Sequence, residues 1–280
     1  MKKKPHIHLI NPFWDPAGGN ERKALTLYHQ LLETNRCDVT LWSEYEPDKR
    51  LKDIFPIKSL RTKQLRFPKT GTFVFFGVYY HIGRWIHFTY PNRIILQYNT
   101  FTPDHLAEKL KRLTNKKKIE MVYCSELIKQ SANMPGVVEP SPIDMENFKP
   151  TTHNSAASTL DTFTIGRHSR DTLSKHHLEN ISLYEELAKE GYLIKLMGGT
   201  CLNNKITHKN IALLPVESQP VANFLQGLDC FLYRTSPGFT EAHGRVVTEA
   251  MACGIPVVCE NRGGYTSLIN HGKNGFIFNN

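Results

Sequence analysis

Short apolar segments alternate with helix-like segments along most of this chain of 280 residues. In the first half, strands are expected at residues 6–10, 39–42, 73–76, 94–97 and 121–124. Residues 21–32 have the spacing of an amphipathic helix. Parallel strands need a long crossover between them, which is usually a helix. The alternation therefore predicts an α/β fold built on parallel sheets.

The alternation begins again in the second half of the chain. Strands are expected at 163–166, 192–197, 211–214, 230–233 and 256–259, with a helix at 181–190. Residues 135–150 are proline-rich, and residues 151–159 are small and polar, which favours a linker or an exposed hairpin. We therefore predict two Rossmann-like doubly wound domains, 1–150 and 151–280, that face each other across a cleft.

Composition narrows the class of protein. The chain is 40% hydrophobic and 22% charged, which is typical of a soluble globular protein. No apolar run approaches the roughly 20 residues that cross a bilayer, and the start lacks the apolar core of a signal peptide. We expect a cytoplasmic protein. The six cysteines form no Cys-x-x-Cys pair, so we expect buried thiols and neither disulfides nor a zinc site.

The formal net charge is +9, and its densest clusters lie in the first half of the chain. They are Lys2 to Lys4 and a second group formed by Lys109, Lys111, Arg112 and Lys116 to Lys118. A frayed terminus and a solvated helix end are the simplest explanations. An anionic acceptor or peripheral contact with an anionic membrane would also fit. No nucleic-acid-binding module is present, so we expect no specific nucleic-acid partner.

Two carboxylates, Glu241 and Glu249, stand eight residues apart near the C-terminus. Gly244 lies between them and opens a helix-like run at 245–253. The N-terminus of such a helix offers unpaired N–H groups and a partial positive charge, which favour phosphate. The two carboxylates can accept hydrogen bonds from sugar and ribose hydroxyls. The alternative is that Glu241 is a solvated loop acid and Glu249 a surface helix residue.

Further candidates follow other expected strands. Arg167 ends the strand at 163–166, where its guanidinium could fork onto phosphate oxygens, and Lys175 follows in a polar loop. Gly18 and Gly19 join the first strand to the first helix, and their N–H groups could meet phosphate or sugar oxygens. His81 follows the strand at 73–76. Surface bases, an ordinary turn and a packed histidine are the respective alternatives.

No Asp-x-Asp pair occurs, and no metal-ligand set is visible, so we predict neither a metal site nor a cofactor. Asn99 and Thr100, which follow the strand at 94–97, are further site candidates.

Together these segments resemble the retaining glycosyltransferases of family 4, which have the GT-B superfold. The similarity spans most of the chain in the family's order and includes Glu241-x7-Glu249, Gly18 to Arg22, Pro142 to Pro150, Thr164 to Arg167 with Lys175, Gly263-Gly264, and Asn274 to Phe276. Pro142 stands where the family usually has glycine.

The resemblance implies an enzyme that moves a sugar from a nucleoside-diphosphate donor to a hydroxyl acceptor. It implies retention of configuration and no metal. The N-terminal domain would take the acceptor, which could be a glycan, a lipid-linked molecule or another hydroxyl compound.

The same resemblance implies a role for each candidate residue. Glu241 and His81 would lie near the donor sugar, Glu249 would bind the ribose, and Arg167 with Lys175 would bind the diphosphate. The remaining donor-binding positions would be Gly18, Gly19, His243, Gly244 and Arg245.

The chain departs from the family pattern at two places. His243 replaces an aromatic or aliphatic residue, and only two residues follow Phe278, where the family continues into closing helices. The chain could be naturally minimal, truncated, or completed by a partner. A binding or scaffold protein without turnover and a GT-B nucleotide-sugar epimerase are the alternative functions.

Overall fold

The computed structural model describes residues 4–16, 18–151 and 162–279, so Lys2, Lys3 and most of the expected linker at 151–159 lie outside the described residues. The chain divides into two compact units, residues 1–142 and 143–280. Residues 143–150 go with the second unit because Phe148 packs against its core and Gln226 Nε2 donates a hydrogen bond of 2.9 Å to Lys149 O. The sequence-based boundary lay near residue 150.

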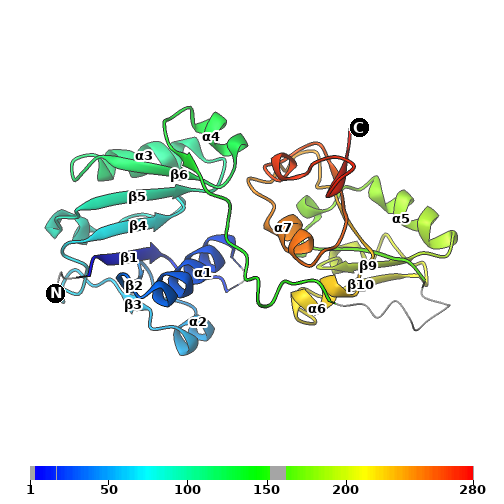
Figure 1. Ribbon diagram of the computed structural model, residues 1–280, viewed down its shortest axis with the longest axis horizontal. Helices are drawn as coiled ribbons and strands as arrows, with labels where there is room; N and C mark the ends of the chain where they lie inside the picture. Colours follow the sequence, from blue (N-terminus) through cyan, green and yellow to red (C-terminus); the bar gives the residue numbers. More distant parts are fainter. Residues whose placement is uncertain (1–3, 17, 152–161, 280) are drawn as a thin grey trace. The chain divides into compact units, whose positions relative to one another are not determined.

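The N-terminal unit is built on a seven-stranded sheet in the order β3-β2-β1-β4-β5-β6-β7, and every neighbouring pair is parallel. The strands are β1 (His6–Asn11), β2 (Asp38–Ser43), β3 (Lys58–Ser59), β4 (Thr72–Phe76), β5 (Arg93–Tyr98), β6 (Ile119–Tyr123) and β7 (Val137–Val138). The helices are α1 (Gly19–Thr34), α2 (Lys49–Ile54), α3 (Pro103–Leu113) and α4 (Glu126–Ala132), with a 3₁₀ turn η1 (Arg84–Phe88) (Figure 1).

Alternate residues of each strand pack on opposite faces of this sheet. Leu9, Val74 and Phe76 share a buried cluster with Leu25 of α1. On the other face, the ammonium of Lys109 in α3 lies 5.9 Å from the ring centroid of Phe75. Helices therefore cover both faces, which is why the strands read as nearly continuous apolar runs.

The C-terminal unit repeats this plan with a six-stranded parallel sheet in the order β10-β9-β8-β11-β12-β13. Its strands are β8 (Thr164–His168), β9 (Leu193–Met197), β10 (Ile211–Leu214), β11 (Cys230–Tyr233), β12 (Val257–Glu260) and β13 (Gly275–Phe278). Its helices are α5 (Asn180–Lys189), α6 (Val221–Gln226) and α7 (Arg245–Ala252), with 3₁₀ turns η2 (Leu173–Lys175), η3 (Thr200–Leu202) and η4 (Thr266–Leu268).

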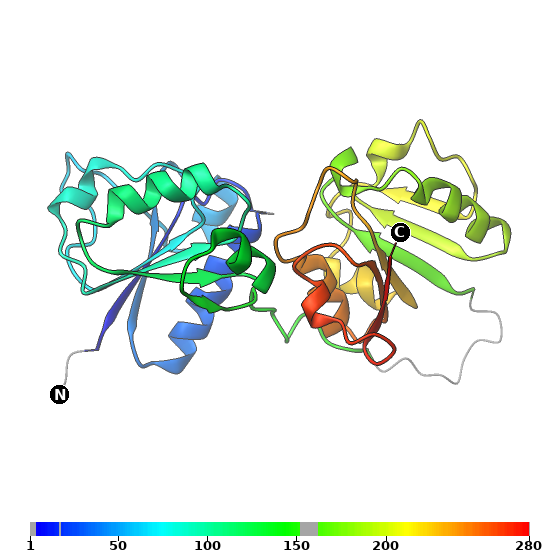
Figure 2. The same cartoon turned by 90° about the horizontal axis from the view of Figure 1, so that it is seen from above.

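The two faces of this second sheet carry separate cores. Tyr184 of α5 packs with Ile194 and Leu232 on one face, whereas Val247 of α7 packs with Phe231 on the other. Figure 2 shows the backbone of the same unit from above. In strand order, the chain runs outward from β8 in one direction and from β11 in the other. The carboxyl ends of these two neighbours form a topological switch point, where ligands bind in open α/β sheets.

The predicted α/β fold with two doubly wound sheets is confirmed, and the predicted strands agree with the observed ones within one or two residues. The sequence analysis did not assign several short elements, including β3 and β7 of two residues each. The assignment of Lys109 to a cluster of surface charges is wrong, because Lys109 is a buried residue of α3. Among the described residues, no helix has the length and apolarity needed to cross a membrane.

Gly166, inside β8, has no room for a side chain. A Cβ there would lie 2.6 Å from Leu228 Cδ2 and 2.7 Å from the Lys195 carbonyl oxygen. We expect Gly166→Ala to lower the free energy of unfolding by about 1–3 kcal/mol. Urea unfolding followed by far-UV circular dichroism would measure it. Gly238→Ala is the control, since a Cβ at Gly238 meets nothing within 4 Å; equal losses in both variants would contradict the packing argument.

Candidate functional site

A buried guanidinium organises the carboxyl edge of the C-terminal sheet. Arg167 lies inside β8, and its Nη1 and Nη2 each donate a hydrogen bond of 2.6 Å, to Arg234 O and Lys175 O. Its Cζ lies 4.6 Å from the ring centroid of Tyr233. Arg167 lies within the strand and not after it, and both terminal nitrogens bond backbone carbonyls. Its contact with a donor phosphate stays a prediction. The Nε atom has no hydrogen-bond partner among the described residues.

Glu241 lies in the loop before α7 and pairs with Lys175. The ammonium of Lys175 donates to Glu241 Oε1, and the same oxygen accepts a hydrogen bond of 2.6 Å from Tyr233 Oη. The side chains of Lys175 and Glu241 are only 9% and 14% exposed, so Glu241 is not a solvated loop acid. Burial lowers the pKa of Lys175, although the charge of Glu241 opposes this effect. The loop thus holds an ion pair in a poorly hydrated place.

Glu249 is buried inside α7, with a side chain 1% exposed. The interpretation as a surface helix residue is therefore wrong. Its carboxylate accepts a hydrogen bond of 2.8 Å from Arg245 Nε and lies 3.3 Å from His168 Nε2. Burial alone would raise the pKa of Glu249, but His168 and Arg245 outweigh burial and lower it. Glu249 is therefore held as a carboxylate at neutral pH.

Gly244 allows the turn that joins these two carboxylates. It is the N-cap of α7 with φ of 76°, a left-handed conformation that favours glycine, and a Cβ would collide with the ring of Tyr265. Gly264 N donates a hydrogen bond of 2.9 Å to Glu241 O, which fixes the loop from the other side. His243 is buried in the same loop, and Arg245 is the first residue of the helix. The first turn of α7 thus directly follows the loop that carries Glu241.

The glycine pair of the N-terminal unit has a different environment. Gly18 is the N-cap of α1, its N–H donates to Asp15 O at 2.9 Å, and Gly19 begins the helix. A Cβ on Gly18 would collide with Glu21 Oε2, so a carboxyl group lies directly against the loop. Burial raises the pKa of Glu21 to about 7. When ionised, this group repels phosphate, and a donor-phosphate role for Gly18 and Gly19 stays a prediction.

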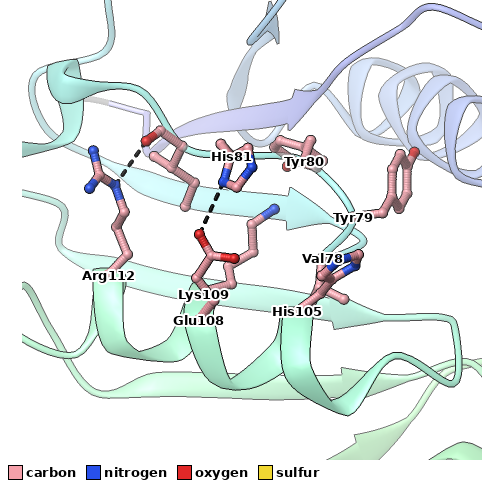
Figure 3. A pocket seen from close by; sticks show the side chains of 9 residues that line it. Val78, Tyr79, Tyr80, His81, His105, Glu108, Lys109 and Arg112 are labelled. Atoms are coloured by element: carbon pink, nitrogen blue, oxygen red, sulfur yellow. Dashed lines mark hydrogen bonds and ion pairs between the residues drawn. The ribbon is translucent and has the colours of Figure 1, made fainter.

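His81 lines an open pocket of the N-terminal unit between the loop at 78–82 and α3 (Figure 3). Its side chain is exposed, and Nδ1 lies 3.0 Å from Glu108 Oε1. At the back of the pocket, the Lys109 ammonium donates to Gly77 O at 3.0 Å and lies 3.1 Å from the Tyr80 ring centroid. Because His81 and Glu241 belong to different units, their joint action on one sugar stays a prediction.

Sequence reasoning missed Tyr233 and Arg234 as parts of this site. Arg234 bonds Glu179 at 3.1 Å and lies 3.6 Å from Glu260, while Tyr233 bonds Glu241. Their position could have identified them, because Tyr233 ends the predicted strand 230–233 and Arg234 follows it. Ligands bind beyond the carboxyl ends of strands in such sheets. Among the described residues, no group of three or more His, Cys, Asp and Glu side chains could hold a metal ion.

Comparison with protein families matches the part of the chain that carries Glu241 and Glu249. Residues 200–280 match the family described as "Glycosyl transferases group 1". A stretch of 40 residues is 52% identical to sucrose synthase from Solanum tuberosum and covers 14% of this chain and 5% of that protein. A stretch of 89 residues is 34% identical to D-inositol 3-phosphate glycosyltransferase from Pseudarthrobacter chlorophenolicus and covers 32% of this chain and 20% of that protein.

Similarity of structure extends over nearly the whole chain. HepE of Anabaena, solved in complex with UDP and glucose, superposes with a TM-score of 0.65 at 14% identity, over 98% of this chain and 86% of that one. The chain therefore has the GT-B fold. The matched stretches span only small parts of the curated relatives. The group 1 match places the glycosyltransferase-like sequence in the C-terminal unit, where Glu241 and Glu249 lie.

Glu21 makes the stability of the N-terminal unit depend on pH. Its pKa is about 7 in the folded chain against 4.5 for the free group, so the folded state binds the proton more tightly. The contribution of Glu21 to the free energy of unfolding is therefore fully present at low pH, and it is lost as the pH rises from about 4.5 to about 7. We expect Glu21→Gln to remove this loss and to be about 2–4 kcal/mol more stable than wild type at pH 8.

Urea unfolding at pH 5 and pH 8, followed by tryptophan fluorescence, would measure this difference, because all three tryptophans belong to the N-terminal unit. The exposed Glu33 of the same helix provides the control variant Glu33→Gln. An identical pH dependence in wild type and Glu21→Gln would refute the assignment.

Proposed function

We propose that this chain transfers a sugar from a nucleoside-diphosphate donor to a hydroxyl acceptor, with retention of configuration and without a metal. The main support is the convergence of Lys175, Glu241, Arg245 and Glu249 at the carboxyl edge of one parallel sheet. This edge lies in the unit that contains the group 1 match. HepE, which shares the fold, was solved with UDP and glucose, and this supports a nucleotide-sugar donor.

In this proposal, the diphosphate lies at the first turn of α7 and against Lys175. The partial positive charge of a helix N-terminus and a partly desolvated ammonium both favour the negative charge that develops on the leaving diphosphate. Lys175 is paired with Glu241 in the structure. A bound diphosphate would draw Lys175 toward itself and free Glu241 to accept hydroxyls of the donor sugar.

Glu249 would then bind the ribose hydroxyls. It is ionised and preorganised by Arg245 and His168. Arg167 acts through Lys175 in this proposal. It bonds the backbone carbonyl oxygen of Lys175 and thereby fixes the backbone from which the lysine side chain extends. In this role Arg167 is a positioning residue.

One observation favours a second candidate function, a nucleotide-sugar-binding protein without turnover. The Glu249 carboxylate is already engaged by Arg245 and His168 and is almost fully buried. Such a group could be structural. Tight binding of a nucleotide sugar without transfer or hydrolysis would favour this candidate.

Donor turnover provides the direct test. We expect release of nucleoside diphosphate from at least one of a panel of UDP-, GDP- and ADP-sugars. Lys175→Met and Glu241→Gln should each lower kcat by about a hundredfold, because each removes a group that faces developing charge or the sugar. Lys209→Met, an exposed lysine of the same unit, is the control. Undiminished turnover in both site variants would refute the assigned roles.

Two further measurements on the same reaction test its finer features. Turnover should persist within about twofold after EDTA treatment, since the proposed stabilisation comes from Lys175 and α7. Proton NMR of the first product should show the anomeric configuration of the donor. Loss of activity with EDTA, restored by Mg²⁺ or Mn²⁺, would overturn metal independence, and an inverted product would overturn retention.

Peripheral contact with an anionic membrane is a separate proposal. It is supported by the net charge of +9 and by the exposed Lys111, Lys117 and Lys118 near the end of α3 and the start of β6. We expect the chain to sediment with phosphatidylglycerol vesicles and not with phosphatidylcholine vesicles. The variant in which Lys111, Lys117 and Lys118 are all replaced by alanine should sediment less with phosphatidylglycerol vesicles. Equal sedimentation of variant and wild type would count against this surface.

A further inference from the structure

Three aromatic side chains gather at the carboxyl edge of the N-terminal sheet. Trp14 follows β1, Tyr45 follows β2 and Tyr79 follows β4. The ring centroid of Trp14 lies 5.3 Å from that of Tyr45 and 5.8 Å from that of Tyr79. Trp14 is 46% exposed and Tyr45 is 38% exposed. We call these three residues the aromatic platform. Its rings offer large, stiff apolar surface at the point where the strands end.

A layer of buried polar groups with unmet hydrogen-bonding capacity lies at the same edge. Asn11 ends β1, Gln97 lies near the end of β5, and Glu21 lies in the first turn of α1. All three are at most 2% exposed, and Gln97 Oε1 has no hydrogen-bond partner among the described residues. Asn11 Nδ2 and Glu21 Oε1 have no partner at full hydrogen-bond distance, although the Asn11 side chain faces Glu21 and lowers the pKa of that carboxyl. Asn99 Oδ1 is also buried without a hydrogen-bond partner among the described residues. Such groups are costly to bury and call for a polar ligand or water.

The strand register explains why these groups meet. Leu9 and Val74 face α1, and Asn11 continues the alternation of Leu9 on β1. Ile95 of β5 packs in the same cluster, so Gln97 and Asn99 continue on that face. The N-terminal turn of α1, which carries Glu21, covers the strands at this point.

Direct contacts join the polar layer to the platform. Tyr79 Oη lies 3.5 Å from Asn11 Oδ1, and Asn99 Nδ2 donates a hydrogen bond of 2.7 Å to Asn20 Oδ1. A Cβ on Gly77 would lie 2.6 Å from both Asn20 Nδ2 and Tyr79 Cε1, so these side chains crowd around one point. Asn20, Tyr79 and Asn99 are half-buried and can be reached from solvent.

The chemistry of this edge matches a sugar. A pyranose has an apolar C–H face that stacks on aromatic rings, and its hydroxyls both donate and accept hydrogen bonds, as do amide side chains. We propose that the aromatic platform and the adjacent amides form a saccharide site, in which the acceptor sugar stacks on Trp14 and bonds Asn99 and Asn20. The acceptor role of this saccharide rests on the proposed glycosyl transfer.

The carboxyl group of Glu21 distinguishes a sugar from an anion. An ionised Glu21 disfavours a phosphate or carboxylate ligand beside Gly18, whereas a hydroxyl can bond either form of the group. The pKa of Glu21 near 7 means that both forms are present at neutral pH.

Saturation-transfer NMR on the full chain, without donor, tests the site. The probes are methyl glycosides of glucose, galactose, mannose and N-acetylglucosamine, with cellobiose and maltose. We expect at least one to bind, with the strongest transfer to protons of one ring face. Trp14→Ala should weaken binding by roughly tenfold, and Asn99→Ala should also weaken it.

Two control variants sharpen the comparison. Trp14→Phe keeps an aromatic face and should retain most of the binding. Tyr90→Ala removes an exposed aromatic residue that lies just before β5, at the amino edge of the same sheet, and should leave binding unchanged. If no probe binds up to about 10 mM, or if Trp14→Ala binds as well as wild type, the saccharide site is refuted.

This outcome is separable from that of the donor experiment. Saccharide binding is measured without a nucleotide sugar, so it can succeed when donor turnover fails, and the reverse also holds. If both succeed, Trp14→Ala should raise the KM for the bound saccharide as acceptor by roughly tenfold, with donor hydrolysis unchanged in the absence of acceptor. A change in donor hydrolysis would place Trp14 in the donor site instead and overturn the acceptor assignment.

Discussion

The buried guanidinium of Arg167 is the interaction on which the C-terminal site depends. Two hydrogen bonds join it to the carbonyl oxygens of Lys175 and Arg234, and its Cζ lies 4.6 Å from the ring centroid of Tyr233. Arg167 thereby joins the loop that follows its own strand to the end of β11, which lies 67 residues further along the chain. A buried guanidinium bonded in this way is costly to disturb, because removing it would leave two carbonyls without partners. Arg167 therefore contacts both residues that bond Glu241, Lys175 and Tyr233.

The ion pair of Lys175 and Glu241 gives each of these two buried groups a partner within the protein. In a poorly hydrated place, a lone ammonium or carboxylate is strongly disfavoured, and each stabilises the other. An anionic ligand can replace Glu241 as the partner of Lys175, and sugar hydroxyls can replace Lys175 as the partners of Glu241. In the proposed sugar transfer, exchange of partners of this kind would couple recognition of the diphosphate to recognition of the sugar within one loop.

The two units share a topology but differ in the chemistry of their carboxyl edges. The C-terminal edge pairs Lys175 and Arg245 with two carboxylates, which suits an anion with hydroxyls. The N-terminal edge gathers aromatic rings, amides and Glu21, which suits a neutral ring with hydroxyls. Parallel sheets provide a place for ligands, and the residues that follow each strand decide which ligand that place can take.

The sequence by itself determined the α/β architecture, because the period of apolar residues and the crossover helices follow from local patterns. It also singled out Glu241, Glu249, Gly244 and Lys175, since their spacing and the glycine turn are visible along the chain. Only the tertiary structure decided that Arg167 bonds carbonyls, that Lys109 is buried and that Tyr233 joins Glu241. These outcomes depend on which side chains meet across strands that are distant in sequence, and burial then fixes their partners and charge. No local pattern contains that information.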